Sequence, residues 1–261
     1  MTTWVLLRGL TREAAHWGEF PALLAQAMPG SHIVAIDLPG AGSLWREPCP
    51  PQVEAMVESC RRQLHEKALR PPYALLGLSL GGMVAAAWAS AWPGELSACV
   101  LVNTSMRPFS PARHRLRPSR LPTLLRLLAP GDARSSEQAV LQLTSNFPQQ
   151  HAGVVESWAA IRQLRPVSAA NALRQLLAAV RYRHPGPWPS LPLLVVSSAR
   201  DALVDASCSR ELALRWRVAQ ISHPQAGHDL PLDAGPWLSA QIADWSCRNL
   251  AATTQARPPA P

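Results

Sequence analysis

The sequence predicts an α/β fold: a mostly parallel sheet with helices on both faces and an inserted helical cap. Short apolar runs alternate with helix-like stretches along most of the chain, but between residues 104 and 190 only helical and proline-rich patterns occur. Strands that alternate with helices imply right-handed β-α-β crossovers and hence a parallel sheet covered on both faces. We therefore expect a core of residues 1–103 and 191–250 and a helical cap of 104–190. The Ala/Pro/Arg-rich segment 251–261 is expected to be a flexible tail.

Six short apolar runs are expected to form the strands. The first, TWVLL, contains β-branched residues and ends at a glycine turn, and the later runs also end in turns or polar loops. The stretches between them have the apolar spacing of helices. The expected strands are residues 3–7, 32–40, 73–78, 98–105, 192–201 and 217–228. The expected helices are residues 12–28, 52–69, 83–91, 207–216 and 236–250 in the core, and 121–129, 136–146, 153–164 and 168–182 in the cap.

Length and composition bound the class of protein. A chain of 261 residues with 48% hydrophobic residues can bury one substantial core with a small cap. No apolar run reaches the roughly 18 residues that a membrane-spanning helix needs, so no membrane span is expected. The N-terminus MTTWVLLRGL has no basic leader and carries Arg8 in its apolar run, unlike a signal peptide. The five cysteines are scattered, odd in number and without metal-ligand spacing, so we expect free thiols in the cytoplasm and no metal.

The positive charge of the chain is concentrated in the expected cap. The net charge is +8, but residues 104–190 hold twelve arginines against three acids, a net +9, and the remainder has thirteen basic against fourteen acidic residues, a net −1. A basic cap could dock an acidic carrier, such as acyl carrier protein or coenzyme A, by electrostatic steering and by phosphate or carboxylate pairing. The alternative is a solvated arginine-rich face without a partner. The candidate docking residues are Arg113, Arg115, Arg117 and Arg120.

Two other kinds of partner are not favoured by the cap sequence. The basic stretch RHRLRPSR has no aromatic residues among its arginines and belongs to no nucleic-acid-binding fold, so no nucleic acid is expected. The apolar stretch LPTLLRLLAP that follows it is short for a helix that lies on a membrane surface.

A serine set among glycines points to nucleophilic catalysis. Gly77-Leu78-Ser79-Leu80-Gly81 joins a strand-like run to an alanine-rich, helix-like segment. A serine hydroxyl is a poor nucleophile unless a tight turn exposes it beside a base, and small residues two before and two after it avoid clashes in the strained turn. The alternative is a glycine-rich turn with a buried serine, but the strand before and the helix after favour the catalytic interpretation.

A nucleophilic serine needs a base and a residue that orients the base. In parallel sheets, ligand groups gather beyond the carboxyl ends of the strands, and both Asp201 and His228 follow late strand-like runs. Alone, each could be an ordinary turn residue, but the chain order Ser, Asp, His is the one known for this serine motif. The alternatives are Asp205, which lies deeper in a helix-like region, and His223, which precedes Pro224 and lacks a glycine that frees its loop.

The oxyanion of an acyl-transfer intermediate needs two backbone N–H groups. One is expected from Leu80, the residue after the nucleophile. The other is expected from Leu10, in the loop that follows the first strand-like run. The alternative for Gly9-Leu10 is an ordinary β-α turn.

These blocks resemble the α/β-hydrolase superfamily, in particular the capped small serine esterases and C–C hydrolases of bacteria, and in style the pimeloyl-carrier-protein methyl esterases. The matching blocks are the loop at Arg8-Gly9, DLPGAG at 37–42, GLSLGG at 77–82, and ARDALV with AGHDLPLD near the end. The resemblance implies the α/β-hydrolase fold and the triad, with no metal or organic cofactor. Many members have His-Gly where this chain has Arg8-Gly9, a change that keeps the backbone donor and leaves open which hydrogen bonds steady the loop.

The resemblance implies a serine hydrolase that cleaves a carboxylic ester or thioester of a small acyl substrate through an acyl-enzyme. Haloalkane dehalogenases of this superfamily need an aspartate nucleophile, so Ser79 excludes that reaction. Three alternatives stay open: an esterase or thioesterase acting on a carrier-bound acyl group, a C–C hydrolase or lyase with the same triad, and a non-catalytic binding protein on this fold. A protein of the last kind would usually have lost the serine, aspartate or histidine.

Overall fold

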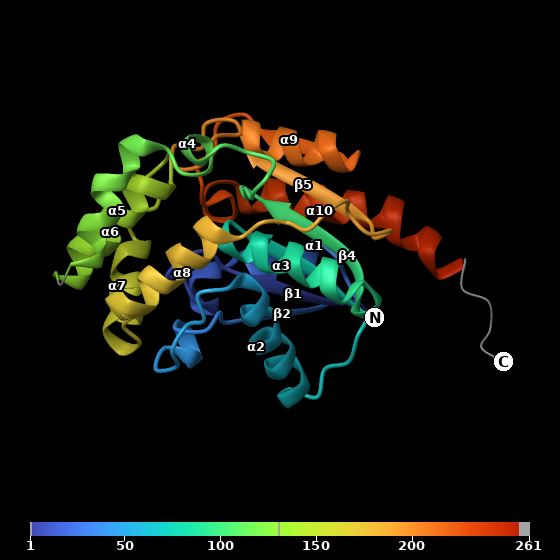
Figure 1. Ribbon diagram of the computed structural model, residues 1–261, viewed down its shortest axis with the longest axis horizontal. Helices are drawn as coiled ribbons and strands as arrows, with labels where there is room; N and C mark the ends of the chain where they lie inside the picture. Colours follow the sequence, from blue (N-terminus) through green and yellow to red (C-terminus); the bar gives the residue numbers. More distant parts are fainter. Residues whose placement is uncertain (1, 130, 256–261) are drawn as a thin grey trace.

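The computed structural model describes residues 2–129 and 131–255. Its centre is a six-stranded sheet in the order β2-β1-β3-β4-β5-β6, and every neighbouring pair is parallel. The predicted α/β fold with a parallel sheet is therefore confirmed (Figure 1). The strands are β1 (Thr3–Leu7), β2 (His32–Ile36), β3 (Tyr73–Leu78), β4 (Leu96–Val102), β5 (Leu193–Ser198) and β6 (Ala219–His223).

Helices cover both faces of the sheet because alternate strand residues point to opposite sides. On β1, Val5 and Leu7 pack with α2 (Val53–Glu66), α3 (Leu80–Ala91) and α9 (Ser207–Trp216). Trp4 and Leu6 pack on the other face with α1 (Phe20–Ala27) and α10 (Leu230–Gln255). All six residues of the central strand β3 are buried, as expected for a strand that is covered on both faces.

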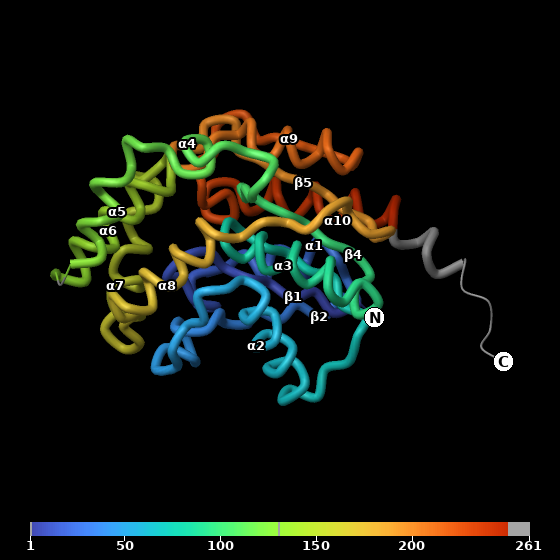
Figure 2. Tube along the Cα trace, in the orientation of Figure 1, coloured from blue at the N-terminus to red at the C-terminus, as the bar shows by residue number. Residues whose placement is uncertain are grey.

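The chain leaves the sheet after β4 and returns to it at β5, and the intervening segment, residues 104–190, is helical (Figure 2). We call this segment the insertion. Its helices are α4 (Ala112–Arg115), α5 (Leu121–Leu128), α6 (Ala133–Thr144), α7 (Val154–Leu164) and α8 (Ala169–Arg181), with a 3-10 turn at Pro118–Arg120. Figure 1 shows α5 to α8 gathered at the end of the sheet at which the strands finish. This is the end where sheets of this kind place their ligand sites.

Several elements differ from the sequence-based boundaries for local reasons. β4 ends at Val102 rather than residue 105, because Asn103 adopts a positive φ of 46° and turns the chain. β6 ends at His223 rather than residue 228, because the next residues form the loop that carries His228. The expected helix over 12–28 is broken at Gly18, which has a φ of 53°.

The C-terminal helix begins earlier than expected. α10 starts at Leu230 rather than residue 236 and is kinked at Ala234, just before Pro236, whose ring cannot sit in a regular helix interior. The helix runs to Gln255, and the rest of the expected tail, residues 256–261, lies outside the described residues.

No helix within residues 2–129 and 131–255 combines the length and the apolar character needed to cross a membrane. Over the same residues, no group of three or more histidine, cysteine, aspartate and glutamate side chains is placed to hold a metal ion.

Candidate active site

Ser79 sits on a sharp turn between β3 and α3. Its backbone has φ 57° and ψ −116°, a strained conformation for a residue with a side chain. A Cβ on Gly77 would lie 2.4 Å from the carbonyl oxygen of Gly81, and a Cβ on Gly81 would lie 2.2 Å from the carbonyl oxygen of Leu7. Both positions therefore require glycine, because any side chain there would collide with the backbone of a neighbouring segment. Thr104 fixes the turn by donating its hydroxyl to the Ser79 carbonyl at 2.7 Å.

Asp201 and His228 lie on separate loops and meet in a buried pair. His228 Nδ1 is 2.7 Å from Asp201 Oδ2, and both residues are more than 90% buried. The other carboxylate oxygen accepts the backbone N–H groups of Leu203 at 2.8 Å and Val204 at 2.9 Å. Three hydrogen bonds thus hold the carboxylate, and through it the imidazole, in one orientation.

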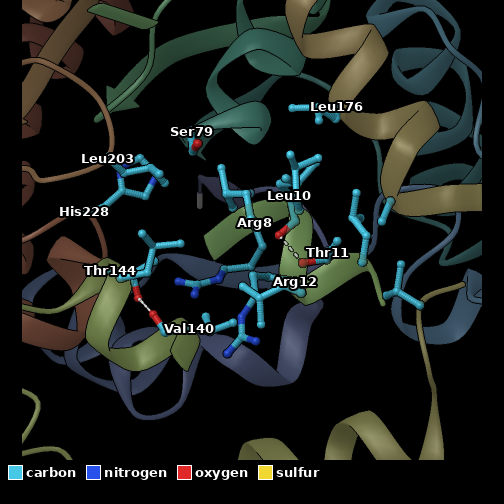
Figure 3. Close-up of a pocket in the computed structure, with 18 of the residues that line it drawn as sticks. Arg8, Leu10, Thr11, Arg12, Ser79, Val140, Thr144, Leu176, Leu203 and His228 are labelled. Carbon is cyan, nitrogen blue, oxygen red and sulfur yellow. Dashed lines mark hydrogen bonds between the residues drawn. The ribbon is translucent and has the colours of Figure 1, made fainter. Parts of the chain in front are cut away.

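Ser79 and His228 line the same cavity. Figure 3 shows the imidazole of His228 beside the hydroxyl of Ser79, with Leu203 next to the ring. Within the described part of the chain, no hydrogen bond joins the two side chains. Such a bond is often long in a free enzyme and shortens in the complex.

The two competing residues have other partners. Asp205 accepts the backbone N–H of Ser207 at 2.9 Å and pairs with Arg117 at 3.1 Å, and these interactions, the hydrogen bond first, lower the pKa of Asp205. His223 uses Nδ1 to accept the N–H of Ala226 at 2.9 Å and lies against Trp237. Neither residue is part of the Asp201–His228 pair.

Leu10 and Leu80, whose backbone N–H groups are the expected oxyanion donors, both lie beside Ser79. Gly9 lies so close that a Cβ there would be 3.1 Å from the Ser79 Cβ, and Leu10 follows it and lines the cavity with Ser79. Leu80 opens α3, so its N–H has no partner within the helix. In the described part of the chain neither the Leu10 nor the Leu80 N–H donates a hydrogen bond.

The loop that carries Leu10 is held from the insertion. Thr11 has a positive φ of 57°, and its N–H donates to Gln175 Oε1 at 2.8 Å. Gln175 is fully buried on α8, and its amide nitrogen donates to the Pro39 carbonyl at 3.0 Å. One side chain of the insertion therefore fixes two loops of the core.

Arg8 forms a buried bidentate ion pair with Asp229, the residue after His228. The two N···O distances are 3.0 and 2.7 Å, and the side chains are only 3% and 6% exposed. Burial acts to raise the pKa of Asp229, but the charges of Arg8, Arg12 and His228 and the hydrogen bonds from Arg8 outweigh it and lower the pKa. This pair joins the loop after β1 to the loop that carries His228. The ion pair therefore steadies the loop after β1 in this chain, where many similar proteins have a histidine in place of Arg8.

A second ion cluster joins the same loop to the insertion. Glu137 on α6 is buried and accepts Arg12 at 2.5 Å and Arg162 at 3.0 Å. The Arg12 guanidinium stacks on Trp158 of α7 at 4.1 Å. Burial lowers the pKa of Arg12, while its carboxylate partner Glu137 acts in the opposite direction.

The last residue of α6 and the segment that follows it bond to both loops of the Asp201–His228 pair. Asn146 donates its side-chain amide to the Arg200 carbonyl at 3.1 Å and to the Gln225 carbonyl at 2.8 Å. The Thr144 carbonyl accepts the N–H of Asp229 at 2.8 Å. The insertion is thus bonded to the loop before Asp201 and to the loop around His228.

Two cavities meet at Ser79. The first, of about 360 Å³, is lined by His228 and Asp229, and we call it the histidine cavity. The second, of about 450 Å³, is lined by Arg107, Arg115 and Arg183 and lacks His228, and we call it the arginine cavity. The residues common to both walls are Leu10, Ser79, Leu116, Leu124, Leu176 and Leu203.

The family model described as "Alpha/beta hydrolase family" matches residues 4–240. The chain belongs to the alpha/beta hydrolase family. A curated relative of this hydrolase is the pimeloyl-[acyl-carrier protein] methyl ester esterase of Chromobacterium violaceum, 26% identical over 231 residues, which cover 88% of this chain and 78% of that protein. The expected family and fold are therefore confirmed.

Solved structures of low sequence identity share the fold of this alpha/beta hydrolase. A thermophilic esterase from Thermogutta terrifontis aligns with a TM-score of 0.74 at 21% identity, covering 95% of this chain and 90% of the esterase. The enol-lactonase from Burkholderia xenovorans LB400 aligns with a TM-score of 0.76 at 18% identity, covering 95% of this chain and 92% of the lactonase. At these identities the likeness shows the fold alone.

Three of the four candidate docking arginines of this hydrolase hold the insertion in place. Arg115 donates to the carbonyls of Ala179 at 2.5 Å and Val180 at 3.2 Å. Arg120 donates to the Ala202 carbonyl at 3.1 Å, and Arg117 pairs with Asp205. Arg113 is exposed. Most of this set therefore has an internal role that charge counting did not predict.

Sequence reasoning missed several residues that position the site. Asn103 donates to the His228 carbonyl at 2.9 Å and to Ser198 Oγ at 3.0 Å, and its Oδ1 accepts the Ser198 N–H at 2.8 Å. It thus joins β5 to the histidine loop. Asn103, Gln175 and the Arg8–Asp229 pair bridge residues far apart in the chain, so no local spacing marks them.

Proposed function

We propose that this protein is a serine hydrolase that cleaves a carboxylic ester or thioester through an acyl-enzyme. The observation that carries the proposal is the buried His228–Asp201 pair, which opens onto the same cavity as Ser79 on its strained turn. The nucleophile, the base and the residue that orients the base are the three parts that acyl transfer requires.

In this mechanism the Ser79 hydroxyl attacks the acyl carbon while His228 Nε2 takes its proton. Asp201, bonded to Nδ1, orients the ring and stabilises its charged form. The oxyanion that forms is bound by the N–H groups of Leu10 and Leu80. The intermediate collapses, the leaving group takes the proton from His228, and an acyl ester remains on Ser79. Water, deprotonated by His228, then attacks this ester, the acid is released and Ser79 regains its proton.

A fluorophosphonate reagent combined with a panel of esters and thioesters of graded chain length tests this function. We expect the reagent to label Ser79 and the wild-type protein to hydrolyse part of the panel, and Ser79→Ala to lose both properties. No labelling and no turnover would favour a binding protein on this fold. Labelling without ester turnover, together with cleavage of a C–C bond beside a carbonyl, would favour the C–C hydrolase or lyase.

A second candidate is hydrolysis of an acyl group bound to an acidic carrier. Two observations favour it: residues 104–190 carry a net +9, and the relative from Chromobacterium violaceum is named for a carrier-protein substrate. Steering between exposed charges weakens as the Debye length falls from about 30 Å at 0.01 M salt to about 10 Å at 0.1 M. We expect kcat/KM for a carrier-bound ester to fall steeply over this range while a small neutral ester is unaffected, and equal salt dependence would contradict the carrier.

A further inference from the structure

The two cavities at Ser79 differ in their charged groups. In the histidine cavity, Arg8, Arg12 and Arg162 are each paired with a carboxylate, from Asp229 or Glu137. The arginine cavity has three arginines and no aspartate or glutamate in its wall. Apart from these arginines its wall is mainly apolar, with leucine, methionine, valine, alanine and proline side chains. It can therefore take an apolar chain and favours a negative charge.

The chemistry of the proposed reaction assigns one cavity to each half of the substrate. The leaving group must receive its proton from His228, so it has to lie on the side of Ser79 that His228 occupies. His228 lines the histidine cavity and is absent from the wall of the arginine cavity. Leu80, whose N–H is a proposed oxyanion donor, lines the arginine cavity. The acyl group therefore extends into the arginine cavity.

Two of the three arginines in this cavity are available to a ligand. Arg115 is committed to the carbonyls of Ala179 and Val180. Arg107 and Arg183 are exposed, and among the described residues their side chains have no hydrogen-bonding or ionic partner. Their backbones pair as a parallel bridge, with the Arg107 N–H donating to the Tyr182 carbonyl and the His184 N–H to the Arg107 carbonyl. Bridged residues lie about 5 Å apart, so both guanidinium groups can reach one anion.

We propose that the arginine cavity selects acyl chains that carry an anionic group at the end far from the scissile ester, and that Arg107 and Arg183 bind this group. The inference rests on the proposed ester hydrolysis and adds a substrate class to it: monoesters of dicarboxylic acids. The same anionic chemistry could come from the phosphate of a carrier joined to the far end of the chain. The experiment below separates the two sources.

The test compares methyl esters of matched chain length with a carboxylate, a methyl group or an ammonium group at the far end. For wild type we expect the carboxylate ester to have the lowest KM. In the double variant Arg107→Ser/Arg183→Ser, its KM should rise about tenfold with little change in kcat, because a distant contact is made equally in the ground state and the transition state. The ester with the methyl end should keep its KM within about twofold.

The matched control is Arg126→Ser/Arg181→Ser, which removes the same charge from exposed arginines of the insertion that line neither cavity. It should leave the KM of every ester unchanged. Arg183→Glu should invert the preference and favour the ammonium ester. Equal wild-type KM values for the three esters together with no response of the coenzyme A conjugate described below, or the same loss in the control variant, would overturn the inference.

A third arm identifies the source of the anion. It uses the carboxylate ester after its free carboxyl group has been joined to coenzyme A as a thioester. If only this conjugate responds to Arg107→Ser/Arg183→Ser, the bound anion is the phosphate of the carrier, and if the free carboxylate ester responds, it is the carboxylate. The test also separates a wrong substrate class from a wrong function. If the protein is not a serine hydrolase, no Ser79-dependent turnover will be seen even for the ester with the methyl end.

Discussion

Gln175 of α8 accepts the backbone N–H of Thr11 at 2.8 Å, so a helix of the insertion holds the loop that carries Leu10, which lines the same cavity as Ser79 and is a proposed oxyanion donor. Loss of an oxyanion donor costs about 10²–10³ in kcat, and a donor that is displaced rather than removed costs less. The insertion therefore contributes to the proposed chemistry as well as to the cavity walls.

Gln175→Leu should lower kcat about tenfold with a smaller change in KM, because the Leu10 N–H loses its fixed position. Gln175→Glu keeps an acceptor for the Thr11 N–H and should retain more of the kcat. Steady-state kinetics on a small neutral ester check both variants. Gln163→Leu, at an exposed position of α7, is the control. A rise in KM alone, or equal kcat for the leucine and glutamate variants, would argue against this positioning role.

Ser79→Ala should abolish ester hydrolysis and leave the protein folded. The side chain is lost from a turn whose backbone is fixed by Gly77, Gly81 and Thr104, so the fold should tolerate it. Removing a nucleophilic serine costs on the order of 10⁴–10⁶ in kcat. Steady-state kinetics measure the loss of kcat, and a thermal unfolding curve checks that the variant is folded. Activity within tenfold of wild type would rule out the serine mechanism.

Asp201→Asn should be far more damaging than Asp205→Asn. The first change leaves His228 without the carboxylate that orients it, at a cost of about 10⁴ in kcat where this has been measured in a triad. The second loosens the Arg117 contact and the turn at Ser207, two residues that line neither cavity at Ser79. A comparison of kcat for the two variants decides, and the reverse ranking would move the acid to Asp205.

His228→Ala should likewise remove the base, and His223→Ala should spare it. The His223 side chain accepts the N–H groups of Gln225 and Ala226 in its own turn and packs on Trp237, so its loss should lower stability before activity. The measurements are kcat and the midpoint of thermal unfolding for each variant. Near-normal kcat in His228→Ala would exclude it as the base.

Asp229→Asn should destabilise the fold by about 3–5 kcal/mol at neutral pH, because it leaves Arg8 buried without its partner. The pKa of Asp229 is lowered in the folded protein, so the pair contributes stability above the ordinary aspartate pKa of about 4, and this contribution is lost as the pH falls through the lowered value. Urea unfolding of wild type and variant should give a constant difference from pH 7 to about pH 5 that shrinks only in stronger acid. If the difference in the free energy of unfolding already decreased near pH 6, the lowered pKa of Asp229 would be wrong.

The parts of the site that follow from local sequence could be predicted, and those that depend on distant contacts could not. Five consecutive residues predict the turn at Ser79. The positions of Asp201 and His228 are predicted because each comes at the end of an apolar, strand-like run. The Arg8–Asp229 pair joins residues 221 positions apart. Nothing in the spacing of either residue signals the other, and only the packed fold brings them together.

Charge counting shows the same limit. It located the positive segment, but it could not tell free arginines from those that hold the chain together. Arg115 and Arg120 satisfy backbone carbonyls, while Arg107 and Arg183, which line the arginine cavity, have no side-chain hydrogen bond or ion pair among the described residues. The distinction depends on the path of the backbone, which the composition of the segment does not contain.

The bonds from Asn146 to the Arg200 and Gln225 carbonyls have a consequence for protein engineering. A chimaera in which the insertion is exchanged for that of a relative would lose the side chain that spaces the acid loop from the histidine loop. Grafts that keep both Asn146 and Gln175 should keep turnover, while grafts that replace Asn146 should lose turnover even when the new helices fold. The exchangeable module in this enzyme scaffold is therefore smaller than the insertion itself.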